Sequence, residues 1–386
     1  MSQSNQDGVN QSMKTTVGDV YTSGENNTTT FNNNQTVNNN QTTRNFNFEY
    51  VLSEEKEKLI KKYAASKPFK QESPYRGFKS FGIDDKKSFF GRDLLSEQLL
   101  DAVEQNNLVL VLGASGSGKS SIVRAGLISR WKEQRKLKNE HYYDFIFTPG
   151  DHPFASLHQG LNNNYKINEG YTSMAKNFKI DTFKNAVEKI KNSKLEKWLF
   201  FIDQFEEIFN VPDEKEGHIF IQSLNKLTEL NDPSIKIVLA MRSDFLGKFE
   251  INPNLSKLVN ENKVEMIGDM TPEELREAIE QPAAEHGVIF EDGLVKQIID
   301  DINGTDRDIS IQKGYLPFLQ YTLYRLWCAE NLSPIHRQLT RRCYSKIGGI
   351  GGSLKQQVQD IYSHFTEEEK VLSRTIFLNL FDIKAL

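Results

Sequence analysis

The sequence contains little cysteine and no long apolar run, and each absence excludes a class of protein. Among 386 residues only Cys328 and Cys343 are cysteines. They lack metal-ligand spacing, so buried thiols in a reducing cytosol fit better than a disulfide framework. No apolar stretch approaches the roughly 20 residues that span a bilayer, and no basic region followed by an apolar core opens the chain. We therefore expect a cytoplasmic protein without a membrane segment.

An excess of charge of one sign is also absent. The formal net charge is −4, so bulk charge gives no clear support for nucleic acid binding, although Arg341-Arg342 leaves a local basic patch open. The seven histidines are scattered, and no protease, nuclease or deaminase constellation is present. With 38% hydrophobic residues, the chain is long enough for two or three domains with their own cores.

The first 45 residues differ in composition from the rest. Residues 1–45 are rich in Asn, Thr, Ser and Gln and cannot build a globular core. A six-residue repeat places Phe31 and Val37 at the head of successive Asn-rich copies. Two interpretations stay open: the segment is disordered, or stacked Asn and Gln side chains let it form assemblies between chains. Residues 46–72 form a linker with a short amphipathic helix from Ser53 to about Ala65.

A glycine-rich loop lies between a buried-strand pattern, Leu108–Leu112, and a helical run, Ser121–Trp131. Such a loop turns backbone N–H groups inward around phosphate oxygens, and the start of the following helix also favours anions. Lys119 adds a positive charge for the β and γ phosphates. The nucleotide ligands predicted from this motif are Gly113, Ala114, Ser115, Gly116, Ser117, Gly118, Lys119, Ser120 and Ser121.

Further apolar runs predict an α/β fold. Residues Tyr142–Phe147, Trp198–Ile202 and Ile235–Met241 alternate with helical stretches, which is typical of a parallel sheet with helices on both faces. Asp203 follows the second run, at the carboxyl edge of the sheet beside the phosphate loop. The Ser120 hydroxyl and the Asp203 carboxylate are the expected protein ligands of Mg²⁺, so ATP or ADP with Mg²⁺ is the predicted cofactor.

Four charged side chains are candidate catalytic residues: Asp203, Glu206, Glu207 and Arg242. A glutamine follows Asp203, where many hydrolysing P-loop enzymes place an acid that polarises the attacking water. Glu206 or Glu207 could supply that acid, or both could be solvated acids at a helix start. Arg242 follows a strand and is a candidate γ-phosphate contact, with an ion pair to Asp244 as the alternative.

Beyond about residue 265 the pattern becomes helical, and we expect a helical lid. Thr271 caps a helix that starts with Pro272, and Glu274 completes a capping box. Pro317 begins another helix in the same way. We interpret Gly348–Gly352 as a flexible turn between helices.

A series of motifs occurs in a fixed order from about residue 75 to the end of the sequence. The motifs are Tyr75-Arg-Gly-Phe78, Phe89-Phe-Gly-Arg92, the phosphate loop with Arg124-Ala-Gly-Leu127, Asp203-Gln-Phe-Glu-Glu207, Arg242-Ser-Asp-Phe245, Gln281-Pro-Ala-Ala284 and Leu316-Pro-Phe-Leu319 before Leu326-Trp327. This series resembles the STAND-class P-loop NTPases, in particular the novel STAND group often fused to WD-repeat propellers.

The resemblance implies a molecular switch. ADP would hold a closed state, ATP would open it, and the opened protein would form a homo-oligomer that activates an effector, with slow hydrolysis as a reset. Phe90, Gly91 and Arg92 would lie against the adenine, Pro317 would contact the nucleotide, and Arg242 would sense it. An effector or sensor protein is the implied partner, with the Asn-rich N-terminal segment as one route to it.

The expected fold is a P-loop NTPase sheet followed by a helical lid and the start of a winged-helix domain. The expected segments are a low-complexity head at 1–45, a linker at 46–72, the NTPase core at 73–265, the lid at 266–364 and a truncated winged helix at 365–386. The leading functional hypothesis is an ATP/ADP switch in bacterial stress or antiviral defence. An AAA+-like remodelling ATPase and a non-catalytic scaffold with structural ADP are the alternatives.

Overall fold

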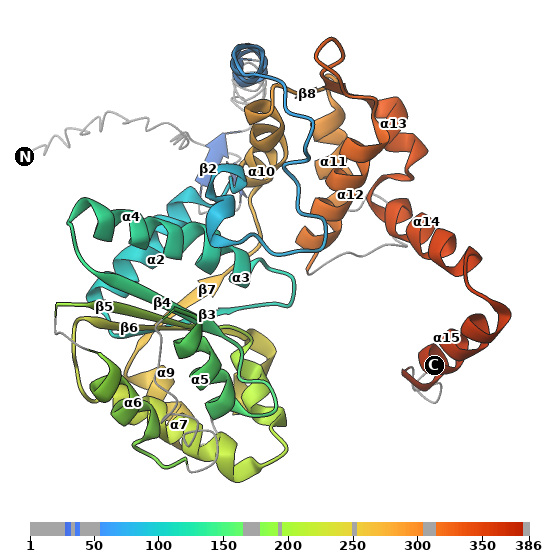
Figure 1. The fold of residues 1–386 in the computed structure, drawn as a ribbon. Coiled ribbons are helices and arrows are strands. Elements are labelled where there is room, and N and C mark those ends of the chain that lie inside the picture. Colours follow the sequence, from blue (N-terminus) through green and yellow to red (C-terminus); the bar gives the residue numbers. More distant parts are fainter. Residues whose placement is uncertain are drawn as a thin grey trace, which may run out of the picture. The chain divides into compact units, whose positions relative to one another are not determined.

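The computed structural model divides the chain into two units, Met1–Tyr63 and Ala64–Leu386 (Figure 1). The residues that it describes are 28–31, 35–38, 55–164, 178–191, 195–248, 253–303 and 314–380. Most of the Asn-rich head and the last six residues, 381–386, therefore lie outside the described residues.

In the first unit, two short strands form an antiparallel pair. Strand β1 (Thr28–Phe31) pairs with β2 (Gln35–Asn38), and Phe31 lies opposite Gln35. Strand β2 crosses the junction between the two copies of the repeat. The pairing is within one chain, so assembly between chains stays a prediction. A helix over residues 55–66 corresponds to the amphipathic pattern of the linker.

The centre of the second unit is a parallel sheet of five strands in the order β4-β5-β6-β3-β7. The strands are β3 (Leu108–Gly113), β4 (Tyr142–Phe147), β5 (Lys197–Ile202), β6 (Ile235–Arg242) and β7 (Lys263–Ile267). All six residues of β3 are buried. This confirms the predicted α/β class and adds an edge strand, β7, that the sequence pattern did not indicate.

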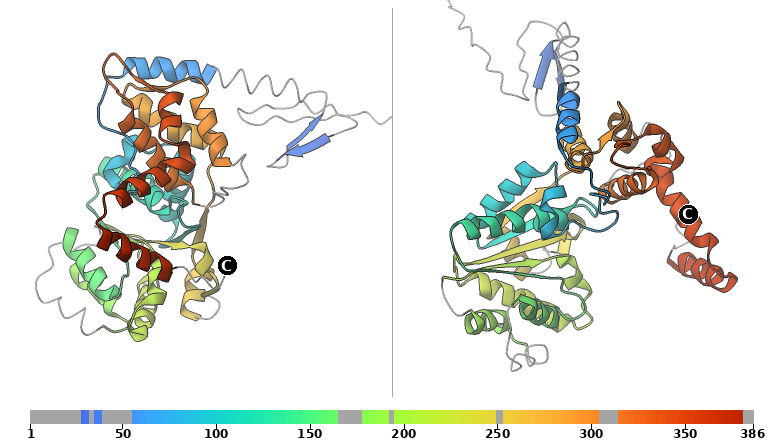
Figure 2. Two further views of the ribbon diagram at one scale, coloured as in Figure 1. Left: turned by 90° about the vertical axis from the view of Figure 1, so that its right-hand side faces the viewer. Right: turned by 45° about the horizontal axis from the view of Figure 1, so that its top comes forward.

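Helices cover both faces of the sheet (Figures 1 and 2). Side chains alternate along β3, so Leu108, Leu110 and Leu112 join one core, while Val109 and Val111 join another on the opposite face. The helices of the first face are α5 (Pro153–Asn164), α6 (Thr182–Ile190), α7 (Glu214–Thr228) and α9 (Pro253–Asn260). Those of the opposite face are α2 (Asp93–Gln105), α3 (Lys119–Ser121) and α4 (Ser129–Leu137), with a π-helical stretch at Ile122–Ile128.

A helical lid with its own core follows the sheet. Its helices are α10 (Pro272–Glu285), α11 (Leu294–Asn303), α12 (Leu316–Ala329), α13 (Arg341–Lys346) and α14 (Gly349–Ser363), and α15 (Glu367–Leu380) follows the lid in the sequence. A short parallel pair, β8 (Ile289–Phe290) and β9 (Gln338–Leu339), accompanies them. The predicted capping box forms, because the Thr271 hydroxyl accepts the Glu274 N–H and Glu274 accepts the Thr271 N–H.

The interpretation of Gly348–Gly352 as a flexible turn was wrong. Gly348 takes the left-handed cap position, with φ of 84°, and α14 begins at the next residue. A helical glycine costs about 1 kcal/mol relative to alanine, but Ile350 and Ser353 in this turn are buried. The Ser353 hydroxyl also lies 2.8 Å from that of Thr322 on α12. Packing against α12 therefore overrides the weak helix propensity of the glycines.

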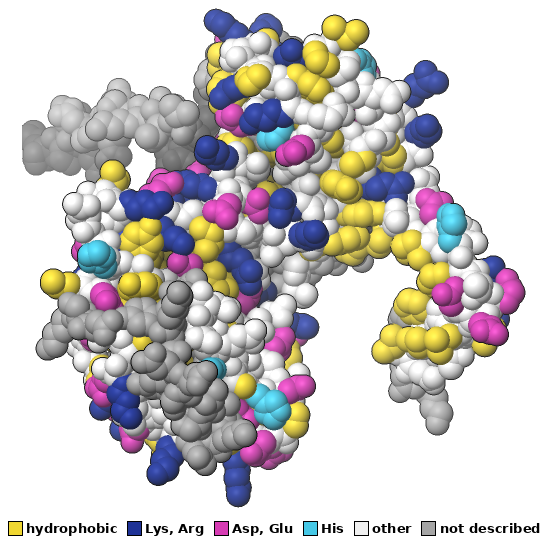
Figure 3. Space-filling view, viewed as in Figure 1, with side chains coloured by type: hydrophobic (Ala, Val, Ile, Leu, Met, Phe, Trp, Pro, Cys, Tyr) yellow, Lys and Arg dark blue, Asp and Glu magenta, His cyan; other side chains and the backbone are white. Residues whose placement is uncertain are grey.

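The last described helix, α15, differs from the lid helices because none of its side chains is buried. Apolar side chains gather on its surface (Figure 3). The exposed ones are Val371, Leu372, Ile376, Phe377, Leu378 and Leu380. The expected winged helix at 365–386 stays a prediction.

Candidate functional site

A cavity of about 360 Å³ lies at the carboxyl edge of the sheet, and the sheet domain and the lid both line it. The phosphate loop supplies residues 115–122, and the ends of β5 and β6 supply polar side chains. The segment before α2 contributes aromatic rings. Lid residues complete the wall; they are Met270, Ala278, Leu316, Pro317 and Gln320. This is the position where open α/β sheets bind ligands.

The phosphate loop has the backbone geometry of an anion cradle. Gly116 and Gly118 have φ of 73° and 89°, a region that favours glycine. The Lys119 ammonium donates hydrogen bonds to the carbonyl oxygens of Gly113 (3.0 Å) and Ala114 (2.8 Å). Burial lowers the pKa of Lys119, while the nearby carboxylates of Glu206 and Asp203 oppose that shift.

Two features of this loop fit a phosphate group. The Ser117 hydroxyl is buried on the cavity wall and has no hydrogen-bond partner within the described part of the chain, so a polar ligand would satisfy it. The Lys119 ammonium lines the cavity and donates to two loop carbonyl oxygens, so a phosphate oxygen in the cavity could replace one of these acceptors.

The predicted magnesium ligands meet directly. The Ser120 hydroxyl donates to Asp203 Oδ1 at 2.9 Å, and both residues line the cavity. Asp203 is only 4% exposed, and its Oδ1 also accepts the Gln204 N–H at 3.0 Å. A hydroxyl and one carboxylate beside phosphate oxygens suit Mg²⁺, which usually binds through one or two carboxylates plus substrate phosphates. Among the described residues, no group of three or more His, Cys, Asp or Glu is arranged to hold a metal ion.

The structure separates the two candidate catalytic glutamates. Glu206 lines the cavity, and its carboxylate accepts the Arg242 N–H at 3.3 Å. Glu207 is not among the lining residues, and its carboxylate accepts the Gly150 N–H at 3.0 Å. Of the two, Glu206 is therefore placed to act on a group in the cavity.

Arg242 lines the cavity at the end of β6 and also forms the alternative ion pair. Its guanidinium donates to the Asp244 carboxylate at 3.0 and 2.6 Å and lies 5.4 Å from the centre of the Phe245 ring. The hydrogen bonds from Arg242 lower the pKa of Asp244. Both side chains are largely exposed, and exposed pairs of this kind contribute little, so a phosphate can compete for the guanidinium.

The segment before α2 meets the lid. Phe90 and Arg92 line the cavity, whereas Gly91 lies against α10 with φ of 79°. A Cβ at Gly91 would collide with the carbonyl oxygen of Glu274, so only glycine permits this approach.

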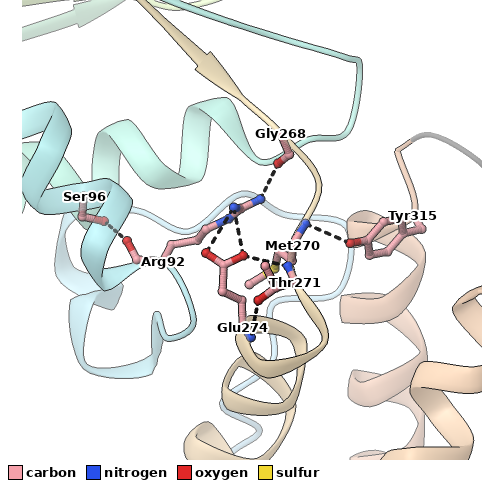
Figure 4. Close-up of polar contacts among 7 residues, drawn as sticks. All are labelled: Arg92, Ser96, Gly268, Met270, Thr271, Glu274 and Tyr315. Carbon is pink, nitrogen blue, oxygen red and sulfur yellow. Dashed lines mark hydrogen bonds and ion pairs between the residues drawn. The ribbon is translucent and has the colours of Figure 1, made fainter. Parts of the chain in front are cut away.

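Arg92 is buried and links the sheet domain to the start of the lid (Figure 4). Its guanidinium donates to the Gly268 carbonyl at 2.6 Å and contacts both Glu274 carboxylate oxygens at 3.4 and 3.5 Å. In the same cluster the Met270 N–H donates to the Tyr315 hydroxyl at 3.3 Å. One guanidinium therefore connects α2, the segment after β7 and α10, and the chain of contacts continues to α12.

Lid residues also contact the phosphate loop. Pro317 occupies the first turn of α12 and lines the cavity beside Leu316. Sequence reasoning missed Met270, Ala278 and Gln320 as lining residues. The sequence around these residues does not indicate that they line the cavity, because their position depends on how the lid packs against the phosphate loop.

The parallel sheet, the phosphate loop between β3 and the following helix, and the Ser120–Asp203 pair define a P-loop NTPase. The profile of the family described as Novel STAND NTPase 1 matches residues 74–385. The chain therefore belongs to this family of nucleotide-binding NTPases, as its motif series indicated. The comparison with curated proteins finds no match.

Several solved structures resemble this chain at low sequence identity. The Orc1 protein of Aeropyrum pernix, solved in complex with DNA, has a TM-score of 0.50 at 12% identity, over 75% of this chain and 72% of that one. A Walker-type ATPase of Pyrococcus abyssi has a TM-score of 0.45 at 14% identity, over 78% and 80%. Domain III of the replication initiation protein DnaA from Thermotoga maritima has a TM-score of 0.41 at 13% identity, over 63% and 87%. At 12% identity the likeness to the Aeropyrum pernix protein shows the fold alone.

The described helices include none that is long and apolar enough to cross a bilayer.

Arg92→Gln should lower the free energy of unfolding by about 2 kcal/mol, because it leaves the Gly268 carbonyl and the Glu274 carboxylate without their charged donor. Urea unfolding without nucleotide measures this. Lys86→Gln is the matched control, because it breaks a more exposed ion pair with Glu133 and should cost less than about 0.5 kcal/mol. Equal costs for the two variants would contradict a linking role for Arg92.

Proposed function

We propose that the chain is an ATP/ADP-controlled signalling switch. It binds ATP or ADP with Mg²⁺ in the shared cavity and hydrolyses ATP slowly. In the ATP state it forms a homo-oligomer that activates an effector, in bacterial stress or antiviral defence. The observation that carries the proposal is the direct contact between the lid and the phosphate loop.

That contact is made by backbone. A Cβ added to Gly116 would lie 2.8 Å from the Cα and carbonyl oxygen of Gly314, and one added to Gly314 would lie 2.5 Å from the Ser115 carbonyl oxygen. Gly314 comes two residues before α12 and has φ of 82°. A phosphate that shifts the loop must therefore also shift the start of α12. Such a coupling suits a protein whose output is a conformational state.

The charged residues at the cavity support a sensor of the phosphate chain. Asp203 is followed by Gln204 rather than by an acid, which favours slow hydrolysis. Arg242 is held by an exposed pair that a γ-phosphate can replace, so its contacts would differ between ATP and ADP. The Asn-rich repeat supports a role of the head in assembly and effector contact. The family resemblance supports the signalling and defence role.

Gly314→Ala should weaken the binding of a fluorescent ADP analogue about tenfold. The new Cβ meets the Ser115 carbonyl oxygen, and a positive φ costs a residue with a side chain about 1–2 kcal/mol. Gly268→Ala is the control. Gly268 lies where the chain passes from β7 to the lid, and nothing lies within 4 Å of the added Cβ. It should bind within twofold of the parent protein. If Gly314→Ala bound equally well, the loop and lid would not be coupled through this contact.

A remodelling ATPase with continuous turnover is the second candidate, and the position of Glu206 on the cavity wall favours it. For either function, Glu206→Gln should reduce the rate of ATP hydrolysis at least tenfold, because the variant loses the only one of the two candidate glutamates that lines the cavity. Glu207→Gln should retain most of the rate. Phosphate release under saturating ATP measures both.

The absolute rate separates the two functions. Slow turnover, on the order of one ATP per minute or less without a partner, is expected of the switch. Rapid turnover that rises with added DNA or protein would instead favour remodelling. A Glu207→Gln variant with the larger defect would contradict the assignment of Glu206.

A further inference from the structure

The two oxygens of the Asp203 carboxylate accept hydrogen bonds from two different side chains. Its Oδ1 accepts the Ser120 hydroxyl, and both residues line the cavity. Its Oδ2 accepts the Arg124 guanidinium at 3.0 Å. Arg124 does not line the cavity. The arginine therefore contacts the carboxylate on the side away from the cavity. Oδ1, which accepts the Ser120 hydroxyl, is the oxygen on the cavity side.

Regular secondary structure fixes this arrangement. Arg124 lies in the π-helical stretch that follows Ser120, and both side chains reach the Asp203 carboxylate at the end of β5. Phe201 and Asp203 share one face at the end of β5, and the Arg124 guanidinium carbon lies 5.8 Å from the centre of the Phe201 ring. The arginine is held by the carboxylate and the ring together, which sets the rotamer of Asp203.

The charged side chains around Lys119 and Asp203 carry no net formal charge. Asp203, Glu206 and Asp244 supply three carboxylates, and Lys119, Arg124 and Arg242 supply three cations, while two further cations, Lys79 and Arg92, line the cavity. A divalent cation needs negative charge to offset the loss of its hydration shell. The protein side chains of this cluster supply no excess negative charge. A bound nucleotide would add the negative charge of its phosphates.

We infer that Arg124 is a positioning residue that makes metal binding conditional on nucleotide. It turns one Asp203 oxygen toward the cavity beside Ser120 and cancels the carboxylate charge, so Mg²⁺ is captured only together with a polyphosphate. The inference rests on the proposed nucleotide site and adds a regulation of that site. It gives Arg124 a role that the phosphate loop by itself does not explain.

The test uses Mn²⁺ as the probe, measured by electron paramagnetic resonance on the full chain stripped of nucleotide. The parent protein should bind Mn²⁺ at least tenfold more weakly without ADP than with it. Arg124→Gln should bind free Mn²⁺ about tenfold more tightly than the parent, because one positive charge beside the site is removed. Arg124→Lys keeps the charge and should behave like the parent.

Arg130→Gln is the matched control on the same helix, because Arg130 pairs with Asp93 away from the cavity, and it should leave Mn²⁺ binding unchanged. Equal Mn²⁺ affinity of Arg124→Gln and the parent would overturn the inference. So would tight Mn²⁺ binding by the parent without nucleotide, a result that needs no variant to fold.

Titration of the parent with a fluorescent ADP analogue in the presence of Mg²⁺ separates this inference from the proposed function. Loss of nucleotide binding there would refute the proposed function, while the series with free Mn²⁺ would still decide the role of Arg124.

Discussion

The close approach of Gly314 to Gly116 is the constraint on which the rest of the site depends. Backbone touches backbone there, and a side chain on either residue would separate the lid from the phosphate loop. Because of this contact the cavity has a wall from each domain, and Pro317 and Leu316 lie over the loop. A P-loop NTPase without such a contact could bind phosphate equally well, but the lid would have no direct mechanical connection to it.

Two arginines, the buried Arg92 and the half-buried Arg124, hold the neighbouring segments in place. Arg92 joins the segment before α2 to Gly268 and Glu274 at the start of the lid, and Arg124 fixes the carboxylate that faces the cavity. Each guanidinium is planar and carries several donors, so it can hold more than one acceptor in a fixed geometry. The first arginine positions the lid and the second positions the candidate metal ligand. Neither role requires direct contact with the nucleotide.

The sequence predicted those parts of the fold whose signal is local. Strand β3 and the phosphate loop follow from a continuous apolar run and from glycine and lysine at fixed spacing. Strand β7 escaped prediction because it lies at the sheet edge and only Ile267 in it is buried. The glycines at the start of α14 were misread because their helix depends on packing against α12. Arg92 could be identified as a candidate, but its partner Glu274 lies 182 residues away, and no pattern within the motif indicates that contact.

The most direct test of the proposed switch is the mass of the purified full chain in solution with ADP and with a non-hydrolysable ATP analogue, together with the nucleotide that it retains. Light scattering coupled to size exclusion measures the mass. The switch predicts retained ADP, a small species with ADP and a larger one with the analogue; Lys119→Ala should lose both the nucleotide and the change in mass. A protein that retains no nucleotide and has the same mass in both conditions would contradict it, and a Lys119→Ala variant that still assembles would favour a scaffold.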